Sequence, residues 1–201
     1  MGDRPPAAGE AFDSFDEIVA RYEKPIFNVV YRILGDYDEA ADVTQETFIS
    51  AYKSFHRFRR ESSVYTWLYQ IALNHSRNRL RRRRRHDVSR TVSLDAPVEE
   101  AGEAAGSREI PDERTSPEKV AEKKELRAKI LAAIESLPPD YREVVVLREL
   151  QGLSYNQIAD ATGISLDNVK TRLSRARAML RRRLGPYYLD GGTGPESEGN
   201  T

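Results

Sequence analysis

The side chains best suited to chemistry lie on one face of the segment from Ser154 to Leu184. From Lys170 to Arg183 this segment holds seven bases and no acid. Such side chains donate hydrogen bonds to phosphate oxygens and to the major-groove edges of purines. The donors on this face are Asn168, Lys170, Thr171, Arg172, Ser174, Arg175 and Arg177. Their spacing predicts a surface that binds double-stranded DNA.

Two short helices joined by a tight turn must position this face. Ser154 with Gln157 has the spacing of a capping box, which starts the first helix. Gly163 stands where the turn needs a positive φ, and Ser165 can cap the second helix. This pattern predicts a helix-turn-helix whose second helix enters the major groove by its first turns. We expect bases to be read by Asn168, Lys170, Thr171, Ser174 and Arg175, and phosphates to be held by Arg172, Arg177 and Arg181 to Arg183.

An amphipathic hairpin with a solvated basic face is the alternative to DNA binding here. Three features argue against this alternative. They are the spacing of alanine before Gly163, the capping pair, and the absence of acids from Lys170 to Arg183.

Charge elsewhere in the chain is strongly segregated, although 32 basic and 32 acidic residues give a net charge of zero. Five acids and no base lie in 36–46, seven arginines and no acid in 77–85, and eight acids with two arginines in 95–118. Two basic blocks separated by an acidic spacer indicate two contacts with a polyanion.

Apolar periodicity predicts an all-α fold with two small helical domains joined by a flexible linker. Three helices would form an N-terminal bundle over residues 13–86, by stripes running from Ile18 to Leu34, from Ala40 through Tyr52 to Phe55, and from Val64 to His75. We expect an acidic flexible linker over 87–117 and the helix-turn-helix domain over 118–184. Residues 1–12 and 185–201 are expected to be disordered.

The composition argues against several other classes of protein. The chain has no cysteine, and His56, His75 and His86 fall in unrelated contexts. There is no Gly-rich phosphate loop and no nucleophile motif, so we expect no catalytic residue, no cofactor and no metal site. No apolar run reaches the roughly 18 residues of a membrane span, and the first residues lack a signal-peptide pattern. The expected location is the cytoplasm.

Longer strings of residues resemble a known family. The strings 137–144 (LPPDYREV), 153–159 (LSYNQIA) and 169–177 (VKTRLSRAR) resemble the region 4 domain of bacterial sigma factors, which binds the −35 promoter element. The strings 42–48 (DVTQETF) and 58–68 (FRRESSVYTWL) resemble their region 2 domain. The chain is similar to the compact extracytoplasmic-function (ECF) group of the sigma-70 family, except that Arg60 stands where that group usually has glycine.

This resemblance implies contacts for the N-terminal bundle. Asp42, Gln45, Glu46 and Ile49 would dock on the clamp helices of the largest subunit of core RNA polymerase. The flap of the second largest subunit would be a further polymerase contact of the protein as a whole. Phe58, Arg60, Ser62 and Ser63 would capture a flipped base of the −10 element. Asn74, Arg77, Asn78 and Arg81 would meet the same element, with the asparagines as candidate base readers. The spacing of Trp67 favours a core position, and the alternative is a role in strand separation.

The resemblance also implies a transcription initiation factor that recognises the −35 and −10 elements and promotes promoter opening. The acidic linker would thread the polymerase cleft, and an anti-sigma factor would hold the protein inactive. Membrane insertion is not expected, and the protein would associate with the nucleoid through polymerase. The alternatives are a stand-alone helix-turn-helix regulator with an N-terminal dimerisation or sensing bundle, and a helical adaptor that binds no DNA.

Overall fold

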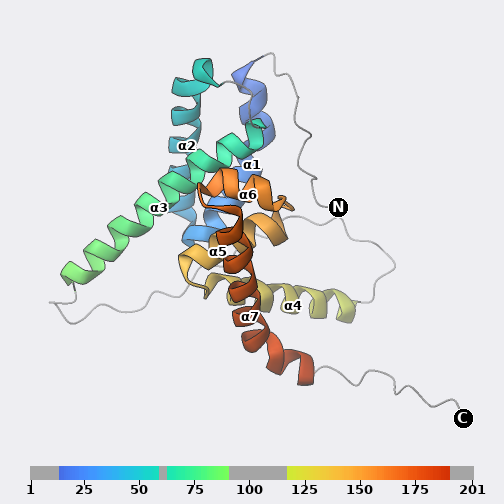
Figure 1. The fold of residues 1–201 in the computed structure, drawn as a ribbon. Helices are drawn as coiled ribbons and strands as arrows, with labels where there is room; N and C mark the ends of the chain where they lie inside the picture. The colour runs from blue at the N-terminus through green and yellow to red at the C-terminus, as the bar shows by residue number, and fades with distance from the viewer. Residues whose placement is uncertain (1–13, 59–62, 91–116, 191–201) are drawn as a thin grey trace, which may run out of the picture.

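The computed structural model describes residues 14–58, 63–90 and 117–190. The predicted linker over 91–116, the loop residues 59–62 and both chain ends lie outside these residues. All regular elements within the described ranges are helices (Figure 1), so the expected all-α class is confirmed. They are α1 (Phe15–Leu34), α2 (Tyr37–Ser54), η1 (Phe55–Arg57), α3 (Val64–Arg90), α4 (Pro117–Glu135), α5 (Pro139–Val145), η2 (Val146–Leu150), α6 (Tyr155–Thr162) and α7 (Leu166–Asp190).

Helices α1, α2 and α3 form the N-terminal bundle. Ser14 caps α1 by accepting a hydrogen bond from the Glu17 amide, and α1 ends at Gly35, which takes a φ of 73° that a side chain would resist. Asp36 then caps α2 through the amide of Glu39 at 2.9 Å. These local signals fix a short α1–α2 turn, which lets the apolar stripes of both helices face α3.

One part of the predicted second stripe is wrong. Tyr52 was expected to face the core, but its side chain is 67% exposed at the end of α2. The chain turns into the 3-10 helix η1 after Ser54, and Phe15 from α1 packs edge-on against Phe55 instead. The ring of Phe15 also contacts that of Tyr52, with centroids 5.2 Å apart.

The second group of helices builds the helix-turn-helix. Residues 146–150 form a π-helical turn, η2, which continues α5 and leads to Gly152 with a φ of 70°. Helix α6 follows after Ser154 and is joined to α7 by the turn at Gly163. Val144, Leu147, Ile158, Val169 and Leu173 bury their side chains where these helices meet.

Two predicted boundaries are corrected by the helices. Helix α3 runs to Arg90, past the expected bundle end at residue 86, and α7 runs to Asp190, past the expected end at Leu184. Helix α7 also spans 185–190, where the sequence led us to expect a disordered tail. The remaining expectation of disorder falls on residues outside the described ranges.

The two groups of helices pack against each other and share one hydrophobic core, which the sequence did not predict. Helix α6 lies across α3, and η2 and α5 contact α1 (Figure 1). The charged C-terminal half of α3 extends beyond this contact on one side of the molecule, and α7 extends on another. In the described ranges, no helix combines the length and the apolar character that a membrane crossing would need.

Candidate nucleic-acid interface

The helix-turn-helix has the capped geometry expected from its sequence. The Gln157 amide donates to Oγ of Ser154 at 3.2 Å, and the Ser154 amide donates to Oε1 of Gln157 at 2.8 Å, which completes the capping box. Gly163 has a φ of 70° and its amide donates to the Ala159 carbonyl at 2.8 Å. Ser165 caps α7 through the Asn168 amide at 3.3 Å. These contacts fix the orientation of α7 against α6.

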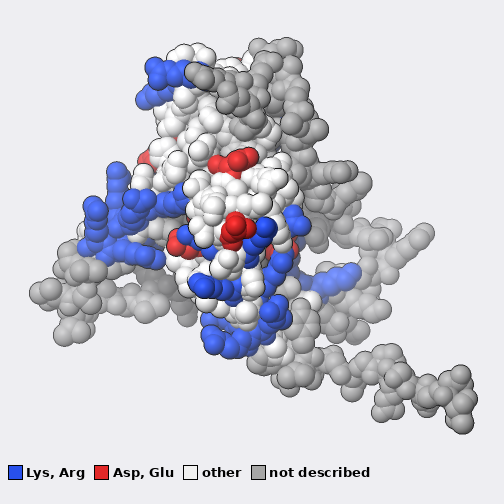
Figure 2. Space-filling model, in the orientation of Figure 1, with Lys and Arg blue, Asp and Glu red and all other residues white. Residues whose placement is uncertain are grey.

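The expected base-reading residues lie together on the solvent side of α7. Asn168, Lys170, Thr171, Ser174 and Arg175 are all exposed, whereas Val169 and Leu173 on the opposite side are buried. Figure 2 shows Lys and Arg gathered over α7 and over the C-terminal part of α3. The sequence pattern and the structure therefore give α7 an accessible face rich in donors.

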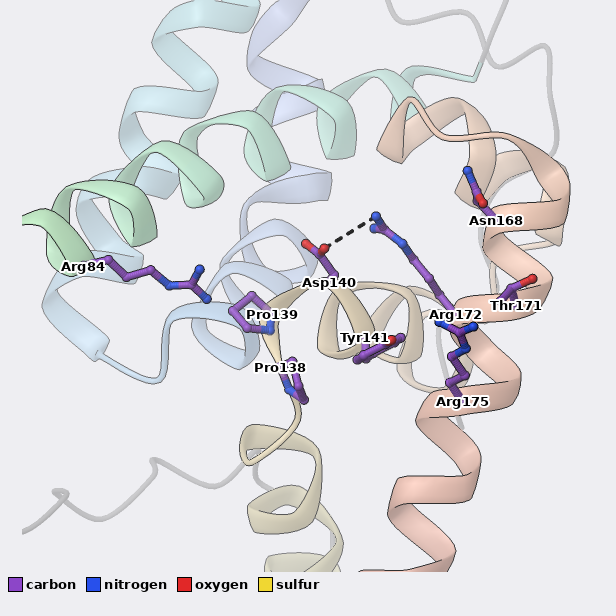
Figure 3. Close-up of a pocket in the computed structure, with 9 residues that line it drawn as sticks. All are labelled: Arg84, Pro138, Pro139, Asp140, Tyr141, Asn168, Thr171, Arg172 and Arg175. Carbon is purple, nitrogen blue, oxygen red and sulfur yellow. Dashed lines mark ion pairs between the residues drawn. The ribbon is translucent and has the colours of Figure 1, made fainter.

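Two of the expected phosphate contacts on α7 are held by acids of the same chain. Arg177 donates from Nε and Nη2 to Oε1 of Glu149 at 3.1 and 2.7 Å. These hydrogen bonds raise the pKa of Arg177 above its ordinary value. Arg172 lies 3.5 Å from the Asp140 carboxylate (Figure 3). Arg181, Arg182 and Arg183 are exposed farther along α7.

Helical phase divides the arginine run of α3 into two sets. Arg83 points toward α1 and α2, where Nη1 donates to the Leu34 carbonyl at 3.1 Å and the guanidinium pairs with Asp36 and Glu39 at 3.2 Å each. Arg79, one turn earlier, pairs with Glu46 at 3.3 Å and with Asp42 at 3.9 Å. The exposed set consists of Arg81, Arg82, Arg84 and Arg85.

The expected polymerase contacts form an exposed strip along α2. Asp42, Gln45, Glu46 and Ile49 are all exposed, and Ile49 is a large apolar side chain left 48% accessible. Glu46 also lies 3.3 Å from Nδ1 of His75, whose Nε2 is 3.0 Å from Oγ of Ser50. His75 therefore connects the strip to α3 rather than simply filling the core.

The expected base-capture loop is described only at its two ends. Arg60 and Ser62 lie outside the described residues. Phe58 packs against Trp67 with ring centroids 4.7 Å apart, and Ser63 accepts a hydrogen bond from the Thr66 amide at 3.2 Å. Trp67 is partly buried, packs against the core and lies beside the rings of Phe55 and Phe58, so its position is only partly the core position that its spacing favours.

The remaining expected −10 contacts lie in two different environments. Asn74, Asn78 and Arg81 are exposed on α3. Arg77 instead forms a bidentate pair with Glu143 of α5, donating from Nε to Oε2 at 3.1 Å and from Nη2 to Oε1. Nη2 of Arg77 also donates to the Thr162 carbonyl at 3.0 Å. This arginine thus bridges α3 to the helix-turn-helix.

Family models match both halves of the chain. Sigma-70 region 2 matches residues 18–86, and sigma-70 region 4 matches residues 127–180. The RNA polymerase sigma-H factor of Pseudomonas aeruginosa is 37% identical over 177 residues, which cover 88% of this chain and 89% of the relative. The ECF RNA polymerase sigma-E factor of Escherichia coli (strain K12) is 38% identical over 173 residues, which cover 86% and 87%. The chain belongs to the ECF group of the sigma-70 family.

Two solved structures have a similar fold. RpoE of Bartonella quintana, in complex with the anti-sigma factor NepR, aligns with a TM-score of 0.63 and 23% identity over 85% of this chain and 96% of that one. CnrH, in complex with the cytosolic domain of CnrY, aligns with a TM-score of 0.57 and 24% identity over 86% and 88%. The helical architecture of this sigma factor is therefore shared with these two structures.

Membership of the family identifies the protein as a transcription initiation factor. Sigma factors work by binding core RNA polymerase. The matched residues show that region 2 corresponds to the bundle of α1, α2 and α3, and region 4 to the helices around the helix-turn-helix.

Sequence reasoning missed several residues that join the two regions of this sigma factor. Glu143 is 3% exposed, and Gln151 accepts hydrogen bonds from the hydroxyls of Tyr65 and Tyr69 at 2.9 and 3.0 Å. Burial raises the pKa of the Glu143 carboxyl, an effect that the Arg77 guanidinium opposes. In the sequence, the apolar run from Val144 to Leu147 directly after Glu143 is a sign that this acid lies at a buried position.

Proposed function

We propose that the two regions of this sigma factor act as separate anchors on a promoter. The domain over 118–184 would bind the −35 element as duplex, and the domain over 13–86 would bind the −10 element and core polymerase. The observation that carries this proposal is the capped helix-turn-helix with an exposed face free of acids from Lys170 to Arg183. A recognition helix needs both an exact turn and accessible donors.

On the −35 side, base edges would be read by the exposed donors at the start of α7. Asn168, Lys170, Thr171, Ser174 and Arg175 have the chemistry and the exposure for this role. Arg177 is held by Glu149, so we expect it to orient α7 and to reach phosphate only secondarily. Arg172 is likewise engaged by an acid of the same chain, because it forms an ion pair with Asp140.

On the −10 side, the loop from Phe58 to Ser63 would take a base out of the duplex. The rings of Phe58 and Trp67 provide a stacking surface beside this loop. Asn74, Asn78 and Arg81 would contact the element along α3, and Arg77 would join them when it leaves Glu143. The factor would supply recognition and binding energy for opening, and polymerase would supply the chemistry of RNA synthesis.

Core polymerase would dock on the exposed strip of α2. Asp42 and Glu46 supply acids for the basic clamp helices of the largest subunit, and Ile49 adds apolar contact. The flap of the second largest subunit would bind the region 4 domain. We place the protein in the cytoplasm, and on the nucleoid through polymerase.

An anti-sigma factor would control the protein. The similar fold of RpoE is solved in complex with the anti-sigma factor NepR, and this supports a partner of the same kind here. Such a partner would mask both DNA-binding surfaces without membrane insertion of the sigma factor itself.

Run-off transcription with purified core RNA polymerase tests the proposal. The template is a promoter found by mapping the transcripts that increase when the protein is overproduced. We expect a specific transcript only when the factor and core enzyme are both present. Absence of a specific transcript, together with tight duplex binding by the free protein at physiological salt, would instead indicate a stand-alone regulator.

A further inference from the structure

The side chain of His75 joins α3 to two residues of α2, the helix against which α3 packs (Figure 1). Its Nε2 lies 3.0 Å from Oγ of Ser50, and its Nδ1 lies 3.3 Å from Oε2 of Glu46. Ser50 and Glu46 are four positions apart, so they lie one turn apart on one side of α2. The imidazole ring is therefore held at both nitrogens by the helix that carries the expected polymerase contacts.

The hydrogen-bonding capacity of the imidazole ring fits this arrangement. A neutral imidazole has one N–H donor and one acceptor, and the partner of one nitrogen decides which nitrogen carries the proton. We assign the Ser50 hydroxyl as the donor to Nε2, which places the proton on Nδ1 and directs it at the Glu46 carboxylate. In this form the ring holds Glu46 without adding a charge.

A second residue of α3 holds the other oxygen of Glu46. Nη2 of Arg79 donates to Oε1 of Glu46 at 3.3 Å, whereas Nη1 of Arg79 lies 3.9 Å from the Asp42 carboxylate. Each oxygen of Glu46 thus has a partner on α3, yet 48% of the side chain remains exposed. The Asp42 side chain is 66% exposed and is held less closely. Glu46 is therefore the more firmly oriented of the two acids.

A carboxylate with a fixed orientation is useful on a surface that binds a basic partner. A long side chain that rotates freely loses rotamer entropy when a partner immobilises it, and this loss weakens binding. The contacts of Glu46 with α3 order its side chain before polymerase arrives. Arg79 has a second effect, because its positive charge offsets that of Glu46. The neutral ring of His75 orients the carboxylate and leaves its charge available.

Ser50, His75 and Glu46 also have the order of a hydrolase triad, but their surroundings do not fit catalysis. A serine nucleophile needs hydrogen-bond donors at the position where an oxyanion develops. Ser50 lies inside α2, so the backbone amides around it are used in the hydrogen bonds of the helix. The Ser50 hydroxyl therefore orients the ring of His75 rather than attacking a substrate.

We propose that His75 is a positioning residue for polymerase binding: held by Ser50, it orients the Glu46 carboxylate for the basic surface that the strip on α2 binds. The proposal rests on the polymerase contact proposed above for this strip. His75 itself needs no contact with polymerase, because it acts through Glu46. A residue of α3 thus contributes to an interface whose direct contacts come from α2.

The affinity of the full-length factor for core polymerase, measured in the absence of DNA, tests the proposal. His75→Phe keeps an aromatic ring and removes both hydrogen bonds. We expect this variant to bind core polymerase about fivefold more weakly, because Glu46 must then be ordered on binding. His75→Asn should recover most of this loss, since the asparagine amide can donate from near the position of Nδ1. The control is His86→Phe, the same substitution at an exposed position farther along α3, which should leave the affinity unchanged.

A double-mutant cycle separates positioning from a general structural role. In a chain that carries Glu46→Gln, there is no carboxylate charge for His75 to orient. His75→Phe should then change the affinity for core polymerase by less than about twofold. A purely structural role of His75 would instead lower the affinity by the same factor in both backgrounds.

Three results would overturn the proposal. They are unchanged core affinity in His75→Phe, a loss in His75→Asn as large as that in His75→Phe, and an equal loss with and without Glu46→Gln. The double variant Asp42→Arg with Glu46→Arg tests the strip on α2 separately. If the double variant loses core binding but His75→Phe does not, the strip remains the polymerase contact and only the role of His75 is wrong. If the double variant binds core polymerase normally, the strip and the role of His75 are both wrong.

Discussion

The two basic helices of this sigma factor use their arginines in different ways. On α7 the first turns present exposed donors on one face, and the apolar side chains face the core. On α3 the guanidinium groups of Arg77, Arg79 and Arg83 are bound by acids and carbonyls of the same chain. Helical phase, rather than the length of a basic run, decides which arginines remain available to an anion.

The two regions also differ in how far their charged side chains are engaged by other groups of the same chain. Region 4 has a recognition face whose expected base-reading donors on α7 are all exposed. In region 2, Arg79 of α3 pairs with Asp42 and Glu46 of α2, so a polymerase surface that bound these acids would compete with internal ion pairs. The predictions below test this contrast.

The largest effect is expected at the polymerase strip of region 2. We expect the double variant Asp42→Arg with Glu46→Arg to abolish binding to core polymerase, because it reverses the charge offered to a basic surface and also repels Arg79. Co-purification with core enzyme measures the effect. Glu23→Arg, at an exposed position on α1, is the matched control and should leave core binding unchanged. If the double variant still binds core polymerase, the strip on α2 is not the polymerase-binding surface.

On region 4, Arg175→Ala should weaken the discrimination between a matched and a mismatched −35 duplex by roughly 1–3 kcal/mol if the side chain makes a bidentate base contact. Titration of the holoenzyme with both duplexes measures this. Arg177→Ala, by contrast, should lower affinity for both duplexes alike, because Arg177 is committed to Glu149. Uniform weakening by Arg175→Ala would show that this residue holds only phosphate.

Within the arginine run, Arg83→Gln should destabilise the protein and Arg82→Gln should not. Arg83 caps the end of α1 at Leu34 and pairs with two acids, but its side chain is 40% exposed, so we expect a loss of only about 1 kcal/mol. Urea denaturation of the two variants measures the difference. Equal stabilities of the two variants would mean that helical phase does not separate structural arginines from exposed ones on α3.

The smallest effect is expected in the pH dependence of stability. Burial raises the pKa of Glu143 from its ordinary 4.5, with Arg77, Arg172 and Asp140 as the charged neighbours. The folded chain therefore holds this proton more tightly than the unfolded chain, and its contribution to stability is complete below pH 4.5 and is lost as pH rises through the raised pKa.

Urea denaturation at a series of pH values can isolate this contribution. From pH 4.5 upward we expect the wild type to lose stability relative to Glu143→Gln, which cannot titrate. Parallel curves for the two proteins would contradict the raised pKa.

Local features of the sequence were sufficient to predict the helix-turn-helix. The capping box at Ser154, the left-handed Gly163 and the cap at Ser165 depend on residues within a few positions of one another. The stripe from Ala40 to Phe55 was predicted less well at Tyr52, because packing at this end of α2 depends on a turn into η1 and on Phe15 from another helix.

The contact between the regions could not be predicted from the sequence in the same way. Arg77 and Glu143 are 66 positions apart, with the whole linker between them, and no local pattern sets their pairing. The phase of the arginine run was available in principle, because His75, Arg79 and Arg83 recur at four-residue spacing opposite the acids of α2. This spacing was hard to recognise because seven of the nine residues in 77–85 are arginines.

Protection of a promoter fragment from nuclease cleavage tests the central claim most directly. The claim is that the two regions bind the −35 and −10 elements together only in the presence of core polymerase. We predict no protection by the free protein at physiological salt, and joint protection of the −35 and −10 elements when core enzyme is added. Protection of the −35 element by the free protein as strong as that by the complex would contradict the account.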